Sequence, residues 1–254
     1  KPGNVRAANA SVSYGNYDAL HGDAGLDIPM GDLAAIRLAV FKDKRDGYVK
    51  LSGVLAPETL AHYGAAVSEQ VARDSAAAPP MEQRDTYGKA FLQVMNIWTR
   101  NETVREFSFS RKLARIAAEL MGVDGVRMYH DQALYKEPGG GHTPWHADQY
   151  YWPLSNANCV TAWVPLQETP LEMGPLEFSA GSQKHNLGRE LRISDDSEER
   201  ITRAALEHRL PLHVSPYALG EVSFHCGWVF HRAGPNRTDQ PRRAMTVIYM
   251  EDGM

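Results

Sequence analysis

The sequence predicts a mainly β protein with flanking α-helices, folded as a double-stranded β-helix, the cupin-like form of the jelly roll. From Val126 onward, short apolar runs alternate with clusters of Gly, Pro, Asn and Asp, which is typical of many short strands joined by turns. Before that point, apolar residues recur at helical spacing over longer segments. We therefore expect a single domain over residues 1–254, with a helical N-terminal part over about 30–122 and a β-helix core over about 126–250.

Length and composition are those of an ordinary soluble domain. Hydrophobic residues make up 43% of the 254 residues, enough for one full core. The net charge of −4 indicates no basic surface for nucleic acid, and no apolar run approaches the roughly 20 residues of a membrane span. Cys159 and Cys226 are too few for a disulfide framework. We expect both to be reduced in a cytoplasmic protein, with neither nucleic acid nor membrane as a partner.

Three segments of the first half have the composition and spacing of helices. They are Asp32–Phe41, the segment from Pro57 to about Arg73, and Lys112–Met121. Pro57 fits the first turn of its helix, and Gly122 is a plausible C-terminal stop for the last one. Gly47–Leu51 is typical of a short strand, and residues 75–90 are expected to form a loop.

Short apolar runs of the second half are the candidate strands of the β-helix. They are Val126–Lys136, Val160–Leu166, Leu176–Phe178, Leu212–Val214, Glu221–Phe224, Val229–Arg232 and Arg242–Met250. The charged segment Ser194–His208 is predicted to be helical and to lie between strands as a loop or lid.

His146 and Asp148 are the strongest candidates for a metal site. Residues two apart in an extended strand point to the same face, so the imidazole and the carboxylate can bind one ion. A second histidine would complete a set of two His and one carboxylate, which leaves coordination positions open and suits non-haem iron(II) oxygenases. Taken alone, the pair is weak evidence for a metal site, because a His is usually partly exposed or hydrogen-bonded and an Asp is usually solvated. His130 and Asp131 are adjacent, point to opposite strand faces and fit a structural role better.

Two histidines in late strands, His225 and His231, compete for the third ligand position. We favour His231, because Arg242 follows it across a turn at residues 234–236. An antiparallel strand pair would bring Arg242 back beside the metal, where a guanidinium can bind the distal carboxylate of 2-oxoglutarate. His225 stays the alternative ligand, and a surface ion pair stays the alternative role of Arg242.

A series of short motifs runs through the chain between about residues 46 and 250. The motifs are Trp145–Gln149, Thr161–Leu166, Glu172–Leu176, Gly181–His185, His231–Arg237 and Arg242–Ala244. In this order they resemble the phytanoyl-CoA dioxygenase family of Fe(II)/2-oxoglutarate oxygenases. The resemblance implies that His146, Asp148 and His231 bind iron and that Arg242 binds the co-substrate.

The resemblance also implies further contacts to 2-oxoglutarate. Gln132 and Trp163 fall where family members contact the co-substrate, and Gln93 is an additional candidate. Trp163 lies on an apolar strand and can equally be part of the core. Family members often carry a small hydroxyl residue two positions after the distal histidine. Ala233 stands there in this sequence, so one hydrogen bond to the co-substrate is expected to be absent or replaced.

The predicted function is that of a 2-oxoglutarate-dependent non-haem iron dioxygenase, an oxidoreductase that uses O2 and releases succinate and CO2. Hydroxylation of a C–H bond of a small molecule is the leading outcome, and desaturation or oxidative ring closure needs the same protein ligands. Halogenating relatives lack the metal carboxylate, so Asp148 argues against halogenation. A non-oxidative cupin-like metal protein and a binding protein are the alternative classes.

Aromatic residues near the motifs are the candidates for substrate binding. Tyr150, Trp152 and Trp228 are expected to line the substrate pocket, with Tyr151 and Arg189 as further candidates for its rim. No clustered basic site for a coenzyme A phosphate is evident. A specialised metabolite, that is, a product of natural product biosynthesis, is therefore the expected substrate class.

Overall fold

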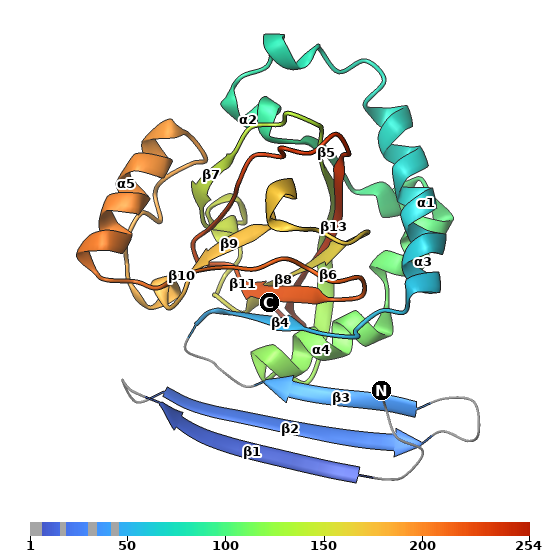
Figure 1. Ribbon diagram of the computed structural model, residues 1–254, viewed down its shortest axis with the longest axis vertical. Coiled ribbons are helices and arrows are strands. Elements are labelled where there is room, and N and C mark those ends of the chain that lie inside the picture. The colour runs from blue at the N-terminus through green and yellow to red at the C-terminus, as the bar shows by residue number, and fades with distance from the viewer. Residues whose placement is uncertain (1–6, 16–18, 30–34, 42–45) are drawn as a thin grey trace. The chain divides into compact units, whose positions relative to one another are not determined.

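The computed structural model describes residues 7–15, 19–29, 35–41 and 46–254 (Figure 1). The chain divides into two compact units, Lys1–Arg45 and Asp46–Met254, and each is described by itself. The expectation of one domain over the whole chain stays a prediction.

The first unit contains an antiparallel sheet with the strand order β1-β2-β3. Its strands are β1 (Ala7–Gly15), β2 (Ala19–Pro29) and β3 (Ala35–Phe41). The helix predicted over Asp32–Phe41 is therefore wrong for Ala35–Phe41, and residues 32–34 lie outside the described residues. Ile36, Leu38 and Val40 also alternate at the two-residue period of a strand, so this short apolar run fits either form. Backbone pairing with β2 decides for the strand.

The second unit is built around eight strands that form a jelly roll. They are β6 (Val126–Lys136), β7 (Thr143–His146), β8 (Cys159–Pro165), β9 (Leu176–Ser179), β10 (Leu212–Val214), β11 (Val222–Cys226), β12 (His231–Ala233) and β13 (Arg242–Glu251). One antiparallel sheet has the order β10-β9-β12-β7. The other has the order β4-β11-β8-β13-β6-β5, with β4 (Tyr48–Leu51) and β5 (Leu92–Met95) at its edges. Apart from the β9–β10 pair, consecutive strands alternate between the sheets, so the predicted double-stranded β-helix is confirmed.

Most strands begin and end within two residues of their predicted limits, but β5 and β7 were not predicted as strands. β7 is only four residues long, contains Pro144 and follows a glycine-rich turn, so its sequence carries almost no strand signal. All four of its residues are nevertheless buried. Pairing with β12 makes this segment a strand.

Three helices cover the outer face of the larger sheet: α1 (Pro57–Asp74), α3 (Glu102–Ser108) and α4 (Arg111–Met121) (Figure 1). The short helix α2 (Thr86–Ala90) lies against β7 of the smaller sheet. The helix from Pro57 and the helix that ends at Gly122 are confirmed, and Gly122 adopts the left-handed conformation with φ of 71°. The segment 75–90, predicted as a loop, contains α2. None of the helices among the described residues is long and apolar enough to cross a membrane.

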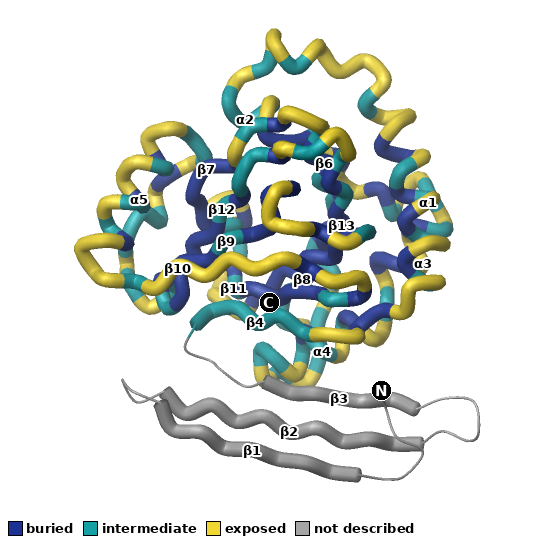
Figure 2. Tube along the Cα trace, viewed as in Figure 1, coloured by how far each residue is buried: buried dark blue, intermediate teal, exposed yellow. Residues whose placement is uncertain are grey.

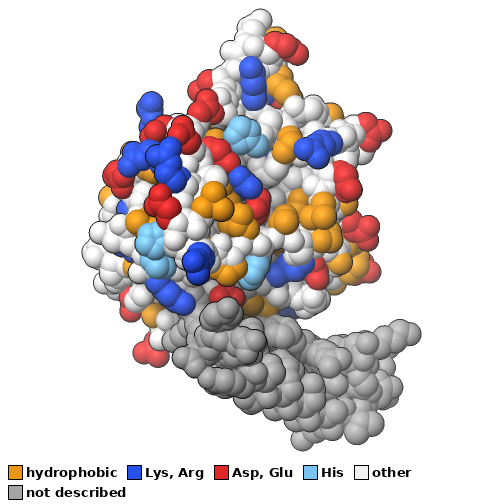
Figure 3. Space-filling view, turned by 60° about the vertical axis from the view of Figure 1, so that its left-hand side comes forward, with side chains coloured by type: hydrophobic (Ala, Val, Ile, Leu, Met, Phe, Trp, Pro, Cys, Tyr) orange, Lys and Arg blue, Asp and Glu red, His pale blue; other side chains and the backbone are white. Residues whose placement is uncertain are grey.

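The predicted charged helix is α5 (Asp195–Glu207), between β9 and β10. Ser194 caps its N-terminus through a reciprocal pair of hydrogen bonds with Ser197. Three acidic residues in its first turn also match the positive end of the helix dipole. Acidic and basic side chains are interspersed on its exposed side (Figure 3).

Successive side chains of a strand point alternately into the core beneath the helices and into the space between the two sheets. Val160, Ala162 and Val164 of β8 join the apolar core between the larger sheet and the helices. Thr161 and Trp163 point the other way, into the space between the two sheets. Figure 2 shows the buried strands at the centre of this unit and the exposed loops and helix faces around it. The inward side chains of the strands therefore form the walls of any site inside the jelly roll.

The close approach of Gly174 to another loop gives a test of this packing. Gly174 has φ of +68°, and a Cβ there would lie 2.2 Å from the carbonyl oxygen of Gly234. Gly139 has a similar φ of +74° but no atom within 4 Å of such a Cβ. We expect Gly139→Ala to lower the free energy of unfolding by about 1 kcal/mol from backbone strain alone. Gly174→Ala should lower it by roughly 3 kcal/mol or more, because backbone must move. Urea unfolding measures both, and equal losses would contradict the packing argument.

Candidate functional site

A cavity of about 640 Å³ opens between the two sheets. Every residue expected to bind metal or co-substrate lines it: His146, Asp148, His231, Gln93, Gln132, Trp163 and Arg242. Of the residues expected to bind substrate, Trp152 lies in its wall (9% exposed). Among the described residues, Tyr150 and Trp228 are not part of this wall; Tyr150 points toward solvent and Trp228 packs under Arg189.

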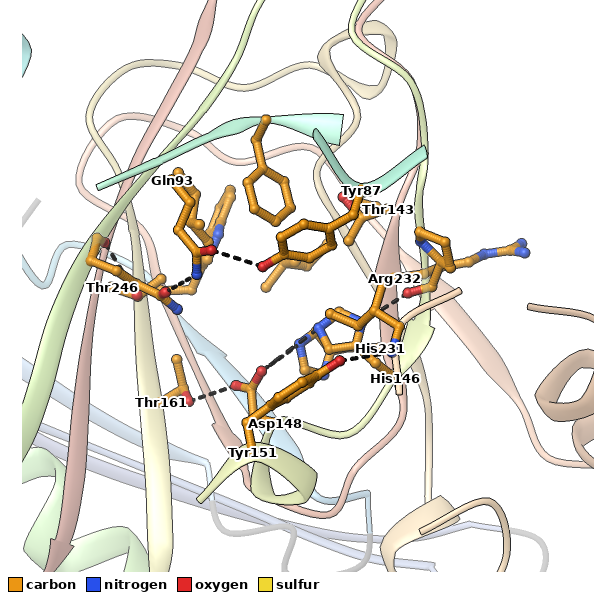
Figure 4. A pocket seen from close by; sticks show the side chains of 18 of the residues that line it. Tyr87, Gln93, Thr143, His146, Asp148, Tyr151, Thr161, His231, Arg232 and Thr246 are labelled. Carbon is orange, nitrogen blue, oxygen red and sulfur yellow. Dashed lines mark hydrogen bonds and ion pairs between the residues drawn. The ribbon is translucent and has the colours of Figure 1, made fainter. Parts of the chain in front are cut away.

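His146, Asp148 and His231 converge on one point (Figure 4). His146 ends β7 and pairs in register with His231, the first residue of β12. Ala147 is extended, with φ of −119° and ψ of 127°, so Asp148 points to the same side as His146. One Asp148 oxygen, Oδ1, lies 3.6 Å from His146 Nε2 and 3.5 Å from His231 Nε2. Bonds of roughly 2.1 Å at right angles separate ligand atoms by about 3 Å, so one metal ion fits among the three.

Both histidines present the correct nitrogen for a metal. His146 Nδ1 lies 2.8 Å from the carbonyl oxygen of Pro144, and His231 Nδ1 lies 3.2 Å from that of Val229. A carbonyl only accepts, so each Nδ1 carries the hydrogen and each Nε2 keeps a lone pair for the metal. Burial lowers the pKa of both imidazoles, that of His231 strongly, which favours the neutral form that a metal binds.

Asp148 is held as an ionised carboxylate. Its second oxygen, Oδ2, accepts a hydrogen bond from Thr161 Oγ1 at 2.9 Å and one from His225 Nε2 at 3.2 Å. Thr161 and His225 face each other on the paired strands β8 and β11. Burial acts to raise the pKa of Asp148, but the surrounding histidines, first His231, hold that pKa below its ordinary value. Oδ1 is thereby left for the metal position.

His225 lies on the Oδ2 side of Asp148, and its ring is also beside that of His231, with the two centroids 4.4 Å apart. Its Nε2 donates to the carboxylate, and its Nδ1 is buried with no hydrogen-bond partner among the described residues. The geometry supports His231 over His225 as the partner of His146 and Asp148.

The side chains of His130 and Asp131 point to opposite faces of their strand, as strand geometry predicts. His130 lies in the cavity wall, whereas Asp131 points to the opposite face of β6. There the Asp131 carboxylate accepts hydrogen bonds from the backbone N–H groups of Ile97 and Trp98 and from Ser108 Oγ. Asp131 is thus a structural anchor for the segment before α3.

Arg242 is a buried cation at the inner end of the cavity, 1% exposed. Its Nη1 donates to the carbonyl oxygen of Gly174 at 2.8 Å, and its Nε has no partner among the described residues. Lys136 lies opposite it on β6 and donates to the carbonyl oxygen of Gly141. Burial lowers the pKa of Arg242 to about 10, and burial together with Arg242 lowers the pKa of Lys136 to about 6.

Within the described part of the chain, neither Arg242 nor Lys136 forms an ion pair with a carboxylate. A buried cation without a counter-ion is costly, and an unpaired guanidinium N–H adds to that cost. An anion bound in the cavity would remove both costs, because it would supply the counter-ion and accept a hydrogen bond from the unpaired N–H. Arg243, the next residue, points to the other face of β13 and donates to Gln167 Oε1, as strand alternation predicts.

A chain of hydrogen bonds joins three further wall residues. Tyr87 Oη donates to Gln93 Oε1 at 2.9 Å, and Gln93 Nε2 donates to Gln132 Oε1 at 2.6 Å. This order leaves the Gln132 amide N–H groups for a ligand. Burial raises the pKa of Tyr87 to about 12, so its hydroxyl keeps the donated hydrogen. Tyr87 carries no motif that predicts a site residue, because only the fold brings the short helix α2 to the cavity.

Residues before α5 close one side of the cavity. Ile193 donates its backbone N–H to Tyr151 Oη at 2.7 Å. Further on, Glu198 accepts from the backbone N–H of Trp145 at 2.9 Å and forms an ion pair with Arg232. The predicted insertion between strands is therefore attached to β7 and β12, the strands that carry His146 and His231.

A model of the phytanoyl-CoA dioxygenase (PhyH) family matches residues 44–244. The chain belongs to this family. Each of the cavity residues expected to bind metal or co-substrate lies inside the matched segment. The matched segment ends within β13, two residues after Arg242.

Curated relatives and solved structures are also similar to this chain. A probable alpha-ketoglutarate-dependent hypophosphite dioxygenase of Stutzerimonas stutzeri is 24% identical over 146 residues, covering 55% of this chain and 50% of that protein. The carbocyclase SnoK from nogalamycin biosynthesis is 25% identical, with a TM-score of 0.67 over 82% of this chain and 81% of SnoK. The epimerase SnoN, solved with Fe3+, alpha ketoglutarate and nogalamycin RO, is 28% identical, with a TM-score of 0.64 over 82% of this chain and 80% of SnoN. The chain spans about half the length of the curated relatives it matches.

The position of His225 on the Oδ2 side of Asp148 yields a prediction about metal binding. We expect His225→Ala to weaken Fe(II) binding by roughly 10- to 100-fold, because Asp148 loses one of the two donors that orient it. His231→Ala should weaken it far more, because it removes a nitrogen from the metal position itself. Anaerobic titration with Fe(II) measures both. Equal losses in the two variants would mean that His225 is itself a ligand.

Proposed function

We propose that this chain is a 2-oxoglutarate-dependent non-haem iron dioxygenase that oxidises, in the first place hydroxylates, a C–H bond of a small molecule. The observation that carries the proposal is the presence of two features in one cavity. One is a His-Asp-His triad with its ligand atoms within 4.8 Å of one another, and the other is the buried guanidinium of Arg242, without a carboxylate partner in the described residues. A metal chelator with a second, distal carboxylate satisfies both features.

In this proposal His146 Nε2, Asp148 Oδ1 and His231 Nε2 hold Fe(II). The fixed tautomers of the two histidines and the double hydrogen bond to Asp148 Oδ2 support the assignment. Iron bound there, with 2-oxoglutarate and O2, supplies the oxidation of the substrate and yields succinate and CO2. The residues of the chain orient the co-substrate and exclude water from the reacting groups.

Arg242 binds the distal carboxylate of 2-oxoglutarate in this proposal, and the free amide N–H groups of Gln132 are further donors. Gln93 acts through its hydrogen bond to Gln132, and Trp163 contributes a wall beside Arg242. Thr143 replaces the hydroxyl that Ala233 lacks, since the two residues are paired across β7 and β12 and both line the cavity.

The names of the relatives support this chemistry and leave its outcome open. SnoN was solved with Fe3+ and alpha ketoglutarate, and SnoK is a carbocyclase, so oxidative ring closure stays the second candidate outcome. Asp148 argues against halogenation, since its carboxylate takes the place that a halide would need. A non-oxidative metal protein or a binding protein has no evident use for the buried charge of Arg242.

The substrate we propose is a specialised metabolite, as for the enzymes of nogalamycin biosynthesis, and not a phosphorus oxyanion, as the name of the Stutzerimonas stutzeri relative would indicate. The cytoplasm is the proposed compartment, and the free thiols of Cys159 and Cys226 support it.

The central test is formation of the metal–co-substrate complex. Under anaerobic conditions, adding Fe(II) and then 2-oxoglutarate should produce a weak visible charge-transfer band before any substrate is known. We expect Asp148→Ala and His146→Ala to lose this band and all 2-oxoglutarate turnover while keeping a folded circular dichroism spectrum. His62→Ala, an exposed histidine on α1, is the control and should keep the band. Normal turnover in Asp148→Ala would refute the metal assignment.

The role of Arg242 is tested against its neighbour on the same strand. Arg242→Met should weaken 2-oxoglutarate binding by about 2–4 kcal/mol, because a bidentate charge-assisted contact is lost. The dissociation constant should therefore rise roughly thirtyfold to nearly a thousandfold. Arg243→Met is the matched control and should leave that constant within about twofold of the unmodified protein. If titration shows the larger effect in Arg243→Met, the assignment of the strand face is wrong.

A further inference from the structure

We propose that the substrate carries a flat, uncharged ring system that lies between Tyr87 and Tyr151. This inference rests on the proposed function and narrows it to a class of substrate. Tyr87 comes from α2, and Tyr151 comes from the 3-10 helix η3 (Asp148–Tyr151) that starts at the proposed metal ligand. Both line the cavity together with the His-Asp-His triad. In Figure 4 the Tyr87 ring lies above the triad, and the Tyr151 ring overlaps the triad in this view.

Both tyrosine rings are fixed by their hydroxyl groups. Tyr87 donates to Gln93 at 2.9 Å, and its ring packs edge-on against Phe91 at 5.2 Å between centroids. Tyr151 accepts from the backbone N–H of Ile193 at 2.7 Å. The ring of Tyr151 also packs edge-on against Tyr150 at 4.8 Å between centroids. The two hydroxyls are thus occupied by the protein, while both side chains still line the cavity. Aromatic walls fixed in this way bind flat rings at little cost in side-chain entropy.

Two large side chains with apolar surface are exposed in the cavity wall, which also carries the exposed charges of Asp85, Arg192 and Asp195. Tyr151 is 48% exposed and Met95 is 44% exposed, and both belong to the cavity wall. Large apolar side chains exposed at the rim of a cavity indicate a binding surface. Methionine adapts its shape to varied ligands and makes favourable contacts with aromatic rings.

The cavity volume also favours a large substrate. Clefts of about 300–1,000 Å³ accommodate drug-sized ligands, and this cavity measures about 640 Å³. 2-Oxoglutarate alone would fill only part of it.

The charges of the wall argue against an anionic substrate. Of the cations in the described part of the wall, Arg242 is assigned to the co-substrate and Arg232 is paired with Glu177 and Glu198. The remaining one, Arg192, is exposed at the rim, where Asp195 also lies. A phosphate, a phosphonate or a coenzyme A tail would need arginine or lysine partners. The inner groups near Tyr87 are the neutral amides of Gln93 and Gln132, which suit hydroxyl and carbonyl oxygens.

The test is equilibrium binding to the protein loaded with Fe(II) and 2-oxoglutarate without O2. The probes are alizarin (a dihydroxyanthraquinone), methylphosphonate and octanoyl-CoA, each followed by quenching of tryptophan fluorescence. We expect saturable binding of alizarin and weaker binding of the other two. Tyr151→Ala and Tyr87→Ala should each weaken alizarin binding roughly three- to tenfold, the range of one aromatic stacking contact.

Two variants separate stacking from other effects. Tyr151→Phe keeps the ring and should bind alizarin nearly as well as the unmodified protein. Tyr150→Ala removes a ring that lies outside the cavity wall but packs edge-on against Tyr151 at 4.8 Å between centroids, and it should weaken alizarin binding less than Tyr151→Ala does. Equal losses in Tyr150→Ala and Tyr151→Ala would overturn the proposal, as would tighter binding of methylphosphonate or octanoyl-CoA than of alizarin.

Binding of 2-oxoglutarate, measured in the same variants, separates this inference from the proposed function. Tyr151→Ala should leave it unchanged. If the unmodified protein binds alizarin through Tyr87 and Tyr151 but forms no complex with iron and 2-oxoglutarate, the ring slot stands and the proposed function fails. If the complex forms and alizarin does not bind, the proposed function stands and the ring slot fails.

Discussion

The antiparallel register of β7 and β12 is the constraint on which the rest of the site depends. It sets His231 opposite His146, with their ring centroids 4.1 Å apart. A slip of one residue would turn His231 to the outer face of the sheet and destroy the triad. The same pairing brings the hydroxyl of Thr143 next to Ala233. β12, with three residues, and β7, with four, therefore hold the two imidazoles and the hydroxyl of Thr143 in fixed positions.

Among the described residues, the interior of the jelly roll holds two charged groups that form no ion pair with a Lys, Arg, Asp or Glu side chain. Asp148 is ionised beside three histidines, and Arg242 is buried against a carbonyl oxygen and the ring of Trp163. Buried ions of this kind cost several kcal/mol each, of the order of the stability of a whole domain. A metal ion and a dicarboxylate would remove both penalties, so ligand binding and stability are expected to be coupled.

The proposed metal and co-substrate ligands come from one part of the fold, and the proposed substrate contacts come from another. The strands supply His146, His231 and Arg242, whose positions are fixed by backbone pairing. The segments that connect or flank the strands supply Tyr87 and Tyr151, which form the aromatic slot. Short connecting segments tolerate substitution better than paired strands, so one rigid centre can serve different substrates.

The local relations of this site follow from the sequence alone. The two-residue spacing of His146 and Asp148, and the opposite faces of Arg242 and Arg243, follow from the alternation of an extended strand, which depends only on neighbours in the chain. The relations between distant segments come only from the tertiary structure. The hydrogen bond of His225 to Asp148, the strand at Ala35–Phe41 and the arrival of Tyr87 at the cavity depend on which strands and helices lie side by side. That arrangement is set by backbone pairing and burial across the fold, and no local pattern of residues encodes it.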